Sequence, residues 1–216
     1  MSRIFEVPTK PWDDYKLYNR KTIAINPGVT VLTGCNGTGK STLMRLMKEQ
    51  LEREEIPVYL YDNLHDGGRH SMQMFLNDGQ IAELITMACS SEGEKINQNI
   101  GQTAVRLGSF VRKNSNHDEL WIMFDAIDSG YSIDNIVEMK RDLLQTILKD
   151  CASRNQTVYI IISANSYEMA AGENCLDVWS GDYISFDNYD EYKKYIIKTR
   201  TRKDKRYIWR KSDLKE

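Results

Sequence analysis

The sequence predicts an α/β fold in which a largely parallel sheet lies buried between helices. Two segments, 119–125 and 157–163, are apolar almost throughout, which is typical of strands covered on both faces. Segments with the spacing of amphipathic helices alternate with such strands along the chain. A glycine-rich loop between a predicted strand and a predicted helix is the third sign of this fold class.

Composition and charge set limits on the class of protein. The chain has 216 residues, of which 41% are apolar and 28% charged, and its net charge is -2, so no global field requires a nucleic-acid or membrane partner. We expect one nucleotide-binding domain over 1–186, followed by a C-terminal helix and basic tail over 187–216. With no signal peptide, no long apolar run and four scattered cysteines, the expected location is a reducing cytoplasm.

The first half of the chain begins with strands and a helix. Segments 21–26 and 29–34 are predicted strands joined at a Pro–Gly turn. A helix is expected over 40–55, because the apolar residues between Leu43 and Leu51 would share one face. The following elements are expected to be a strand over 56–63, a glycine-bearing loop over 64–79 and a helix over 80–88.

The second half repeats the alternation of helix and strand. A long helix is expected over 94–112, where apolar residues from Ile96 to Val111 recur at spacings of three and four. The stretch "CLDVWSGDYISF" predicts a hairpin that turns at Ser180–Gly181. The remaining elements are expected to be a strand over 119–125, a helix over 133–150, a strand over 157–163 and a last helix from Asp187.

The stretch "VLTGCNGTGKST" carries the pattern of a phosphate-binding loop, G-x-x-x-x-G-K-[ST]. Its glycines allow backbone amides to point at phosphate oxygens, at the N-terminal end of the next helix. Lys40 is expected to reach the β- and γ-phosphates of ATP, and Ser41 to bind Mg²⁺. The loop residues expected to bind ATP are Gly34, Asn36, Gly37, Thr38, Gly39, Lys40, Ser41 and Thr42.

An acid ends the apolar strand "LWIMFD". Ligands of open α/β sheets lie at the carboxyl ends of the strands, and this is where Asp125 falls. We therefore expect Asp125 to hold Mg²⁺ together with Ser41.

A third motif lies between these two, in "CSSEGEKINQN". Ser91, Gly93 and Glu94 match the S-x-G-[QE] core of the signature of ATP-binding-cassette (ABC) ATPases. Residues 20–170 thus resemble the soluble branch of that family: the ATPase heads of chromosome maintenance and DNA repair, and small phage- or defence-type AAA/ABC ATPases. In that resemblance, 21–26 and 29–34 look like the paired strands that precede the loop.

The resemblance implies a homodimer that forms on ATP binding, with DNA or a second protein subunit as partner and no membrane. The signature of one subunit, Ser91, Gly93 and Glu94, would close over the ATP of the other. The same residues also fit a capping box, in which Ser91 and Glu94 only begin a helix.

Two positions depart from the family pattern. Ala126 stands where the family has the Glu that acts as general base, and Asn165 stands where it has a histidine that senses the γ-phosphate. Asp128 is an alternative residue to orient water, or it only caps a turn. Asn165 is expected to contact phosphate or water, although Ser163 and Asn165 could equally cap a helix. Together, Ala126 and Asn165 therefore indicate slow hydrolysis of ATP or an ATP-gated clamp.

The residue that stacks on adenine would come from the aromatics before the first strand. Trp12, Tyr15 and Tyr18 are the candidates, and Tyr18 is the expected one, although each could belong to the core. For the glutamine that follows the third strand in the family, the sequence offers Gln73, Asn63 or Asp62.

Alternatives to an ATPase remain at this stage. A P-loop kinase acting on a small molecule or nucleotide would share the loop, but it would need arginines on a lid. A non-hydrolysing, ATP-gated scaffold would explain Ala126. The tail over 198–211 is rich in Lys and Arg and carries Tyr207 and Trp209, which fits nucleic-acid binding; a solvated helix end is the favoured interpretation, because no readout motif is present.

Overall fold

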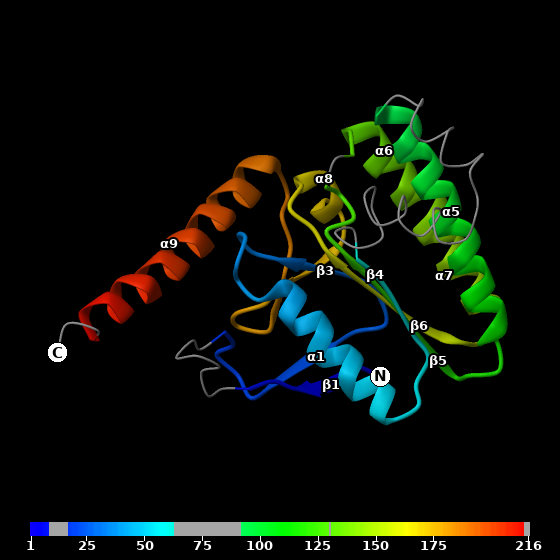
Figure 1. Cartoon of the computed structure of the whole chain (residues 1–216), viewed down its shortest axis with the longest axis horizontal. Helices are drawn as coiled ribbons and strands as arrows, with labels where there is room; N and C mark the ends of the chain where they lie inside the picture. Colours follow the sequence, from blue (N-terminus) through cyan, green and yellow to red (C-terminus); the bar gives the residue numbers. More distant parts are fainter. Residues whose placement is uncertain (9–16, 63–91, 130, 214–216) are drawn as a thin grey trace, which may run out of the picture.

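A six-stranded sheet forms the centre of the molecule (Figure 1). The computed structural model describes residues 1–8, 17–62, 92–129 and 131–213. In spatial order the strands are β4 (Val58–Asp62), β5 (Glu119–Asp125), β6 (Thr157–Ser163), β3 (Gly28–Thr33), β7 (Asn174–Asp177) and β8 (Asp182–Ile184). All neighbours are parallel except β8, which runs antiparallel to β7. The predicted α/β fold with a largely parallel sheet is therefore confirmed.

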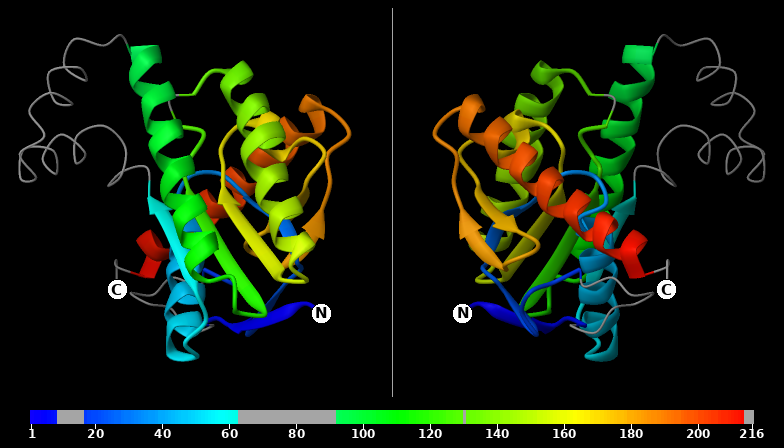
Figure 2. Two further views of the ribbon diagram at one scale, coloured as in Figure 1. Left: turned by 90° about the vertical axis from the view of Figure 1, so that its right-hand side faces the viewer. Right: turned by 90° about the vertical axis from the view of Figure 1, so that its left-hand side faces the viewer.

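Helices cover both faces of this sheet. One face packs against α1 (Lys40–Arg53) and a separate two-stranded sheet of β1 (Arg3–Glu6) and β2 (Thr22–Ile25). Figure 2 shows the last helix crossing the side of the molecule opposite to the one on which α5 lies. The other helices are α5 (Glu92–Lys113), α6 (Ile133–Glu138), η1 (Met139–Leu144), α7 (Gln145–Ser153), α8 (Tyr167–Ala170) and α9 (Tyr189–Asp213).

Alternate residues of the central strands fill two separate cores. In β5, Leu120, Ile122 and Phe124 join the core under α5 and α7, whereas Trp121 and Met123 join the core under α1. All five side chains are fully buried. This two-sided burial is why the central strands read as continuous apolar runs instead of alternating patterns.

The predicted elements in the described part of the chain are present, but one predicted strand pairing is not. Segment 21–26 contains β2 as expected, but β2 pairs with β1 and not with β3, so the predicted pairing of these two strands is wrong. Both edges of β3 are occupied by β6 and β7, which leaves β2 no place beside it. The segments 64–79 and 80–88 lie outside the described residues.

The segment predicted as a single helix over 133–150 is continuous but changes geometry in its middle. Six residues, Met139–Leu144, form a π-helical stretch between α6 and α7. This stretch carries Lys140, whose ammonium donates to the carbonyls of Glu168, Met169 and Ala171 at the end of α8. The short helix α8 follows β6, where a helix capped by Ser163 or Asn165 was one alternative, and β1 was not predicted.

The carboxyl ends of the strands form a row of polar residues. Asp62 of β4 lies opposite Asp125 of β5, and Asp125 lies opposite Ser163 of β6. Because β6 lies between β5 and β3, the turn that follows β6 reaches the space between the acidic strand and the loop after β3. None of the helices in the described ranges has the length and apolar character needed to cross a membrane.

Candidate functional site

The loop between β3 and α1 has a backbone that requires glycine. Gly34, Gly37 and Gly39 all have positive φ angles, of 140°, 79° and 98°, a region that other residues rarely adopt. A Cβ atom on Gly34 would lie 2.7 Å from Thr38 Oγ1, and Thr38 Oγ1 itself donates to the Cys35 carbonyl at 2.9 Å. The loop is therefore closed tightly around its own backbone.

Helix α1 begins directly at this loop, at Lys40. Gly39 is the residue that precedes the helix, and it has no side chain that could cap the helix start. The first turn contains no acidic residue either. Amides at the start of a helix carry partial positive charge and bind anions, so this end of α1 favours a phosphate group.

Lys40 lies folded back on the loop. Its ammonium donates to the carbonyl of Gly34 at 2.7 Å and to the side-chain oxygen of Asn165 at 3.2 Å. Only 7% of the residue is exposed. Burial lowers the pKa of Lys40, while the nearby charges of Asp125 and Asp128 act in the opposite direction. A buried cation held mainly by neutral oxygens has strong affinity for an anion.

A cavity of about 210 Å³ lies over the loop and the carboxyl edge of the sheet. Pockets for whole drug-sized ligands measure roughly 300–1,000 Å³, so this cavity fits a phosphate chain better than a complete nucleotide. The residues that line it are Asn36, Gly37, Gly39, Lys40, Ser41, Thr42, Asp125, Ala126, Ser163 and Asn165.

Ser41 and Asp125 line this cavity together. In the described ranges no group of three or more His, Cys, Asp or Glu side chains is arranged to hold a metal ion on its own. Mg²⁺ typically binds one or two carboxylates and completes its shell with waters and substrate phosphates. One hydroxyl and one carboxylate beside a phosphate cavity match that chemistry, so Ser41 and Asp125 fit a magnesium ion.

Asp128 is buried and is not among the residues that line the cavity. Its Oδ2 atom accepts hydrogen bonds from the amides of Asn165 and Ser166, each at 2.7 Å. The Asn165 carbonyl also accepts a hydrogen bond from the hydroxyl of Tyr192 at 2.9 Å. Asp128 therefore fixes the turn that presents Asn165 to Lys40, and the residue that caps α8 is Ser166, in place of Ser163 or Asn165.

Ala126 has a positive φ angle of 54°. This conformation costs a non-glycine residue about 1–2 kcal/mol. The Ala126 amide donates to the Ser163 carbonyl at 3.0 Å, which joins the ends of β5 and β6. Since alanine has no group that can accept a proton, the position next to Asp125 supplies no general base.

Tyr18 occupies the core below the loop. It is 0% exposed, and its hydroxyl donates to the Gly39 carbonyl at 3.1 Å. Burial raises its pKa. In this position the ring has no exposed face on which an adenine could stack, so the residue supports the loop from within. Trp12 and Tyr15 lie outside the described residues.

The signature residues are only partly described. Ser91 lies outside the described residues, whereas Gly93 and Glu94 fall in the first turn of α5. Figure 2 shows α5 running antiparallel to the strand that follows it, so its first turn points toward the carboxyl end of the sheet. The signature and the helix cap both remain predictions. Of the glutamine candidates, Asn63 and Gln73 lie outside the described residues and Asp62 ends β4 beside Asp125.

Residues of α9 contact the phosphate loop, and sequence reasoning did not find them. Thr199 Oγ1 accepts a hydrogen bond from the Cys35 amide at 2.9 Å. Lys203 Nζ donates to the Asn36 carbonyl at 2.7 Å. The basic composition of 198–211 distinguishes this helix in the sequence, but no local pattern in it indicates that the helix contacts the loop.

Comparison with known proteins agrees with this geometry. A family model described as an AAA domain matches residues 24–166, which is more than half of the chain. No protein with curated annotation matches the chain. The matched range contains the loop, the acidic strand and the turn that carries Asn165.

Proposed function

The chain belongs to the AAA domain family of P-loop NTPases, and on that basis we propose that it binds ATP with Mg²⁺ and hydrolyses the ATP slowly. The observation that carries this proposal is the meeting of Lys40, Ser41, Asp125 and Asn165 in one cavity over a glycine loop. These side chains come from three separate segments of the chain. The match to the ABC branch of P-loop ATPases remains a resemblance.

The loop supplies most of the binding. Its amides and the start of α1 favour the phosphates, and the Lys40 ammonium exchanges the Gly34 carbonyl for a phosphate oxygen. Ser41 and Asp125 hold Mg²⁺, which when bound neutralises charge on the β- and γ-phosphates. The adenine lies beyond the cavity.

Slow hydrolysis follows from the groups that face the cavity. Asn165 can orient a water molecule through its amide but cannot take a proton from it at neutral pH. Ala126 offers no acceptor, and Asp128 acts through Asn165, as a positioning residue. Among the described residues that line the cavity there is thus positioning and charge but no general base, a group worth about 10²–10⁴-fold.

The metal site gives the first test. We expect Asp125→Asn to raise the Mg²⁺ concentration needed for half-maximal phosphate release by about tenfold, because a ligand charge is lost. Steady-state phosphate release at varied Mg²⁺ measures this, with Asp118→Asn as control, since Asp118 is an exposed carboxylate just before the other end of the same strand. An unchanged Mg²⁺ dependence would remove Asp125 from the site.

The same assay separates the alternative activities. ADP and phosphate released without any acceptor indicate an ATPase. ADP formed only when a small molecule or nucleotide is added indicates a kinase. Tight ATP binding with no turnover indicates the ATP-gated scaffold.

We also propose that ATP closes two subunits into a homodimer through Ser91, Gly93 and Glu94, and that this dimer acts on DNA or a second protein. Light scattering with a non-hydrolysable ATP analogue and Mg²⁺ should show the mass doubling for wild type. Ser91→Arg should bind nucleotide and remain monomeric, whereas Ser90→Arg, which adds the same charge one residue earlier, should still dimerise. A wild-type monomer that binds nucleotide would leave Ser91 as a helix cap.

A further inference from the structure

Helix α9 lies against the phosphate loop through two residues on one of its faces. Thr199 and Lys203 are four residues apart, a spacing that aligns side chains along a helix. Thr199 is 1% exposed and accepts from the Cys35 amide, while Lys203 donates to the carbonyl of the next residue, Asn36. Two consecutive residues of the loop therefore bind one face of α9.

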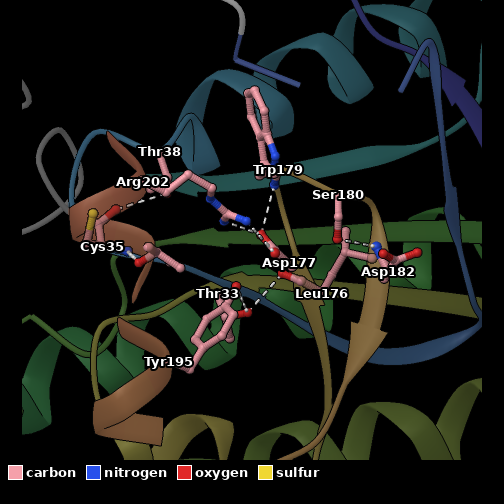
Figure 3. A network of polar contacts seen from close by, with 12 residues as sticks. Thr33, Cys35, Thr38, Leu176, Asp177, Trp179, Ser180, Asp182, Tyr195 and Arg202 are labelled. Atoms are coloured by element: carbon pink, nitrogen blue, oxygen red, sulfur yellow. Dashed lines mark hydrogen bonds and ion pairs between the residues drawn. The ribbon is translucent and has the colours of Figure 1, made fainter. Parts of the chain in front are cut away.

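This position of α9 is held by a partly buried ion pair. Arg202 makes two hydrogen bonds to the carboxylate of Asp177, at 2.9 and 3.1 Å, and Asp177 is only 7% exposed. The guanidinium also lies 5.7 Å from the ring centre of Trp179. Figure 3 shows Arg202 and Tyr195 directed from α9 toward the ends of β7 and β3. Lys203 follows directly after this anchor, so its place over the loop is set by the fold.

Lys203 lies close to the loop backbone. A Cβ atom on Gly37 would be 3.1 Å from its ammonium nitrogen, so glycine at this position allows the cation to approach. Asn36, to which Lys203 donates, and its neighbour Gly37 both line the phosphate cavity. The ammonium of Lys203 therefore lies next to loop residues that would face a bound phosphate.

The charge of Lys203 also acts on Lys40. Burial lowers the pKa of Lys40, and the positive charge of Lys203 adds to this effect. Two cations near one loop repel each other, and an anion bound beside them relieves that repulsion. A phosphate oxygen is also a stronger partner for an ammonium than the neutral carbonyl of Asn36.

We propose that Lys203 is a second phosphate-binding cation of the nucleotide site, supplied by α9, and that its ammonium moves from the Asn36 carbonyl to a phosphate oxygen of the bound nucleotide. This inference rests on the ATP binding proposed above. It gives the loop a cation from a distant part of the chain in addition to Lys40.

Titration with ATP in the presence of Mg²⁺ tests the proposal. We expect Lys203→Ala to weaken ATP binding by about tenfold, the effect of losing one charged hydrogen bond, and Lys203→Arg to retain most of the affinity. The control is Lys205→Ala, which removes the same charge from an exposed position two residues on and should change the affinity less than about twofold. Equal losses for Lys203→Ala and Lys205→Ala would overturn the proposal.

Lysine acetylation of the wild-type protein gives a second measurement that does not depend on a variant. With mass spectrometry as readout, ATP should slow acetylation of Lys203 and leave Lys205 unchanged. If wild type binds ATP while the affinity of Lys203→Ala and the reactivity of Lys203 both stay unchanged, the inference fails and the proposed function stands. If wild type binds no ATP, the inference about Lys203 and the proposed function both fail.

Discussion

Replacing Lys40 with methionine should reduce ATP affinity by about 100-fold or more. The ammonium is the one charged group on the loop itself that reaches the cavity, and methionine keeps a similar length without charge or donors. The loop amides would remain, so weak binding of the phosphates is expected to persist.

The fold should survive this change. Lys40 is buried and its pKa is lowered by that burial, which means that its charge is unfavourable in the folded protein without an anion. Methionine removes this penalty together with the hydrogen bonds to Gly34, Cys35 and Asn165. These two effects oppose each other, so the melting temperature of the ATP-free protein should change by only a few degrees.

Calorimetric titration with ATP and Mg²⁺, together with thermal melting, measures both quantities. Lys48→Met is the matched control, because Lys48 lies on the same helix and forms a surface ion pair with Glu52. That variant should bind ATP like wild type. Undiminished binding by Lys40→Met would show that the cavity over the loop is not the nucleotide site.

Replacing Trp121 with alanine should lower the free energy of unfolding by about 3–5 kcal/mol. The side chain is 0% exposed. Its ring stacks on Tyr159 with centroids 4.0 Å apart and meets Phe5 edge-on at 5.1 Å. The alanine variant would leave a cavity and remove both aromatic contacts.

Urea unfolding of wild type and variant gives the difference in stability. Val105→Ala is the control, because Val105 is 70% exposed and its truncation should change stability by less than about 0.5 kcal/mol. A loss below about 1 kcal/mol for Trp121→Ala would mean that the core under α1 can collapse around the gap. Because Phe5 belongs to β1, loss of Trp121 should also loosen the two-stranded sheet.

Much of the fold could be predicted from local patterns. The strands at 119–125 and 157–163 are correct at both ends, because each apolar run is buried on both faces and ends at a polar residue. The hairpin turn is also confirmed: Gly181 has a φ angle of 70° and joins β7 to β8. In these segments the local sequence pattern is enough to predict the structure.

Other features depend on contacts that no local pattern contains. In β1 only Phe5 is buried, so this strand has no apolar alternation by which it could be found. The family resemblance implied that segments 21–26 and 29–34 pair, but β3 is a central parallel strand whose partners come from elsewhere in the sequence. Which strands pair is a property of the whole sheet.

In the candidate site, too, local motifs indicate some residues, whereas contacts between distant segments could not be predicted. The loop motif singles out Lys40 and Ser41, and the acidic strand singles out Asp125; all three line one cavity, and their roles toward ATP and Mg²⁺ stay predictions. For Tyr18 the structure favours the alternative of a core residue over adenine stacking. The contact of Lys203 with Asn36 was missed, since it joins residues 167 positions apart. No spacing rule connects such distant segments.

The order of the strands in the sheet also determines when each strand can pair while the polypeptide is being synthesised on the ribosome. β3, which leads into the phosphate loop, is translated early, but both of its neighbours come much later: Val31 pairs with Ile162 and Cys175. At a translation rate of about 5–20 residues per second, β3 waits roughly 7–26 s for Ile162. During that time its apolar residues and backbone donors have no native partner in the sheet, so the nascent chain is then most exposed to aggregation and to chaperone capture.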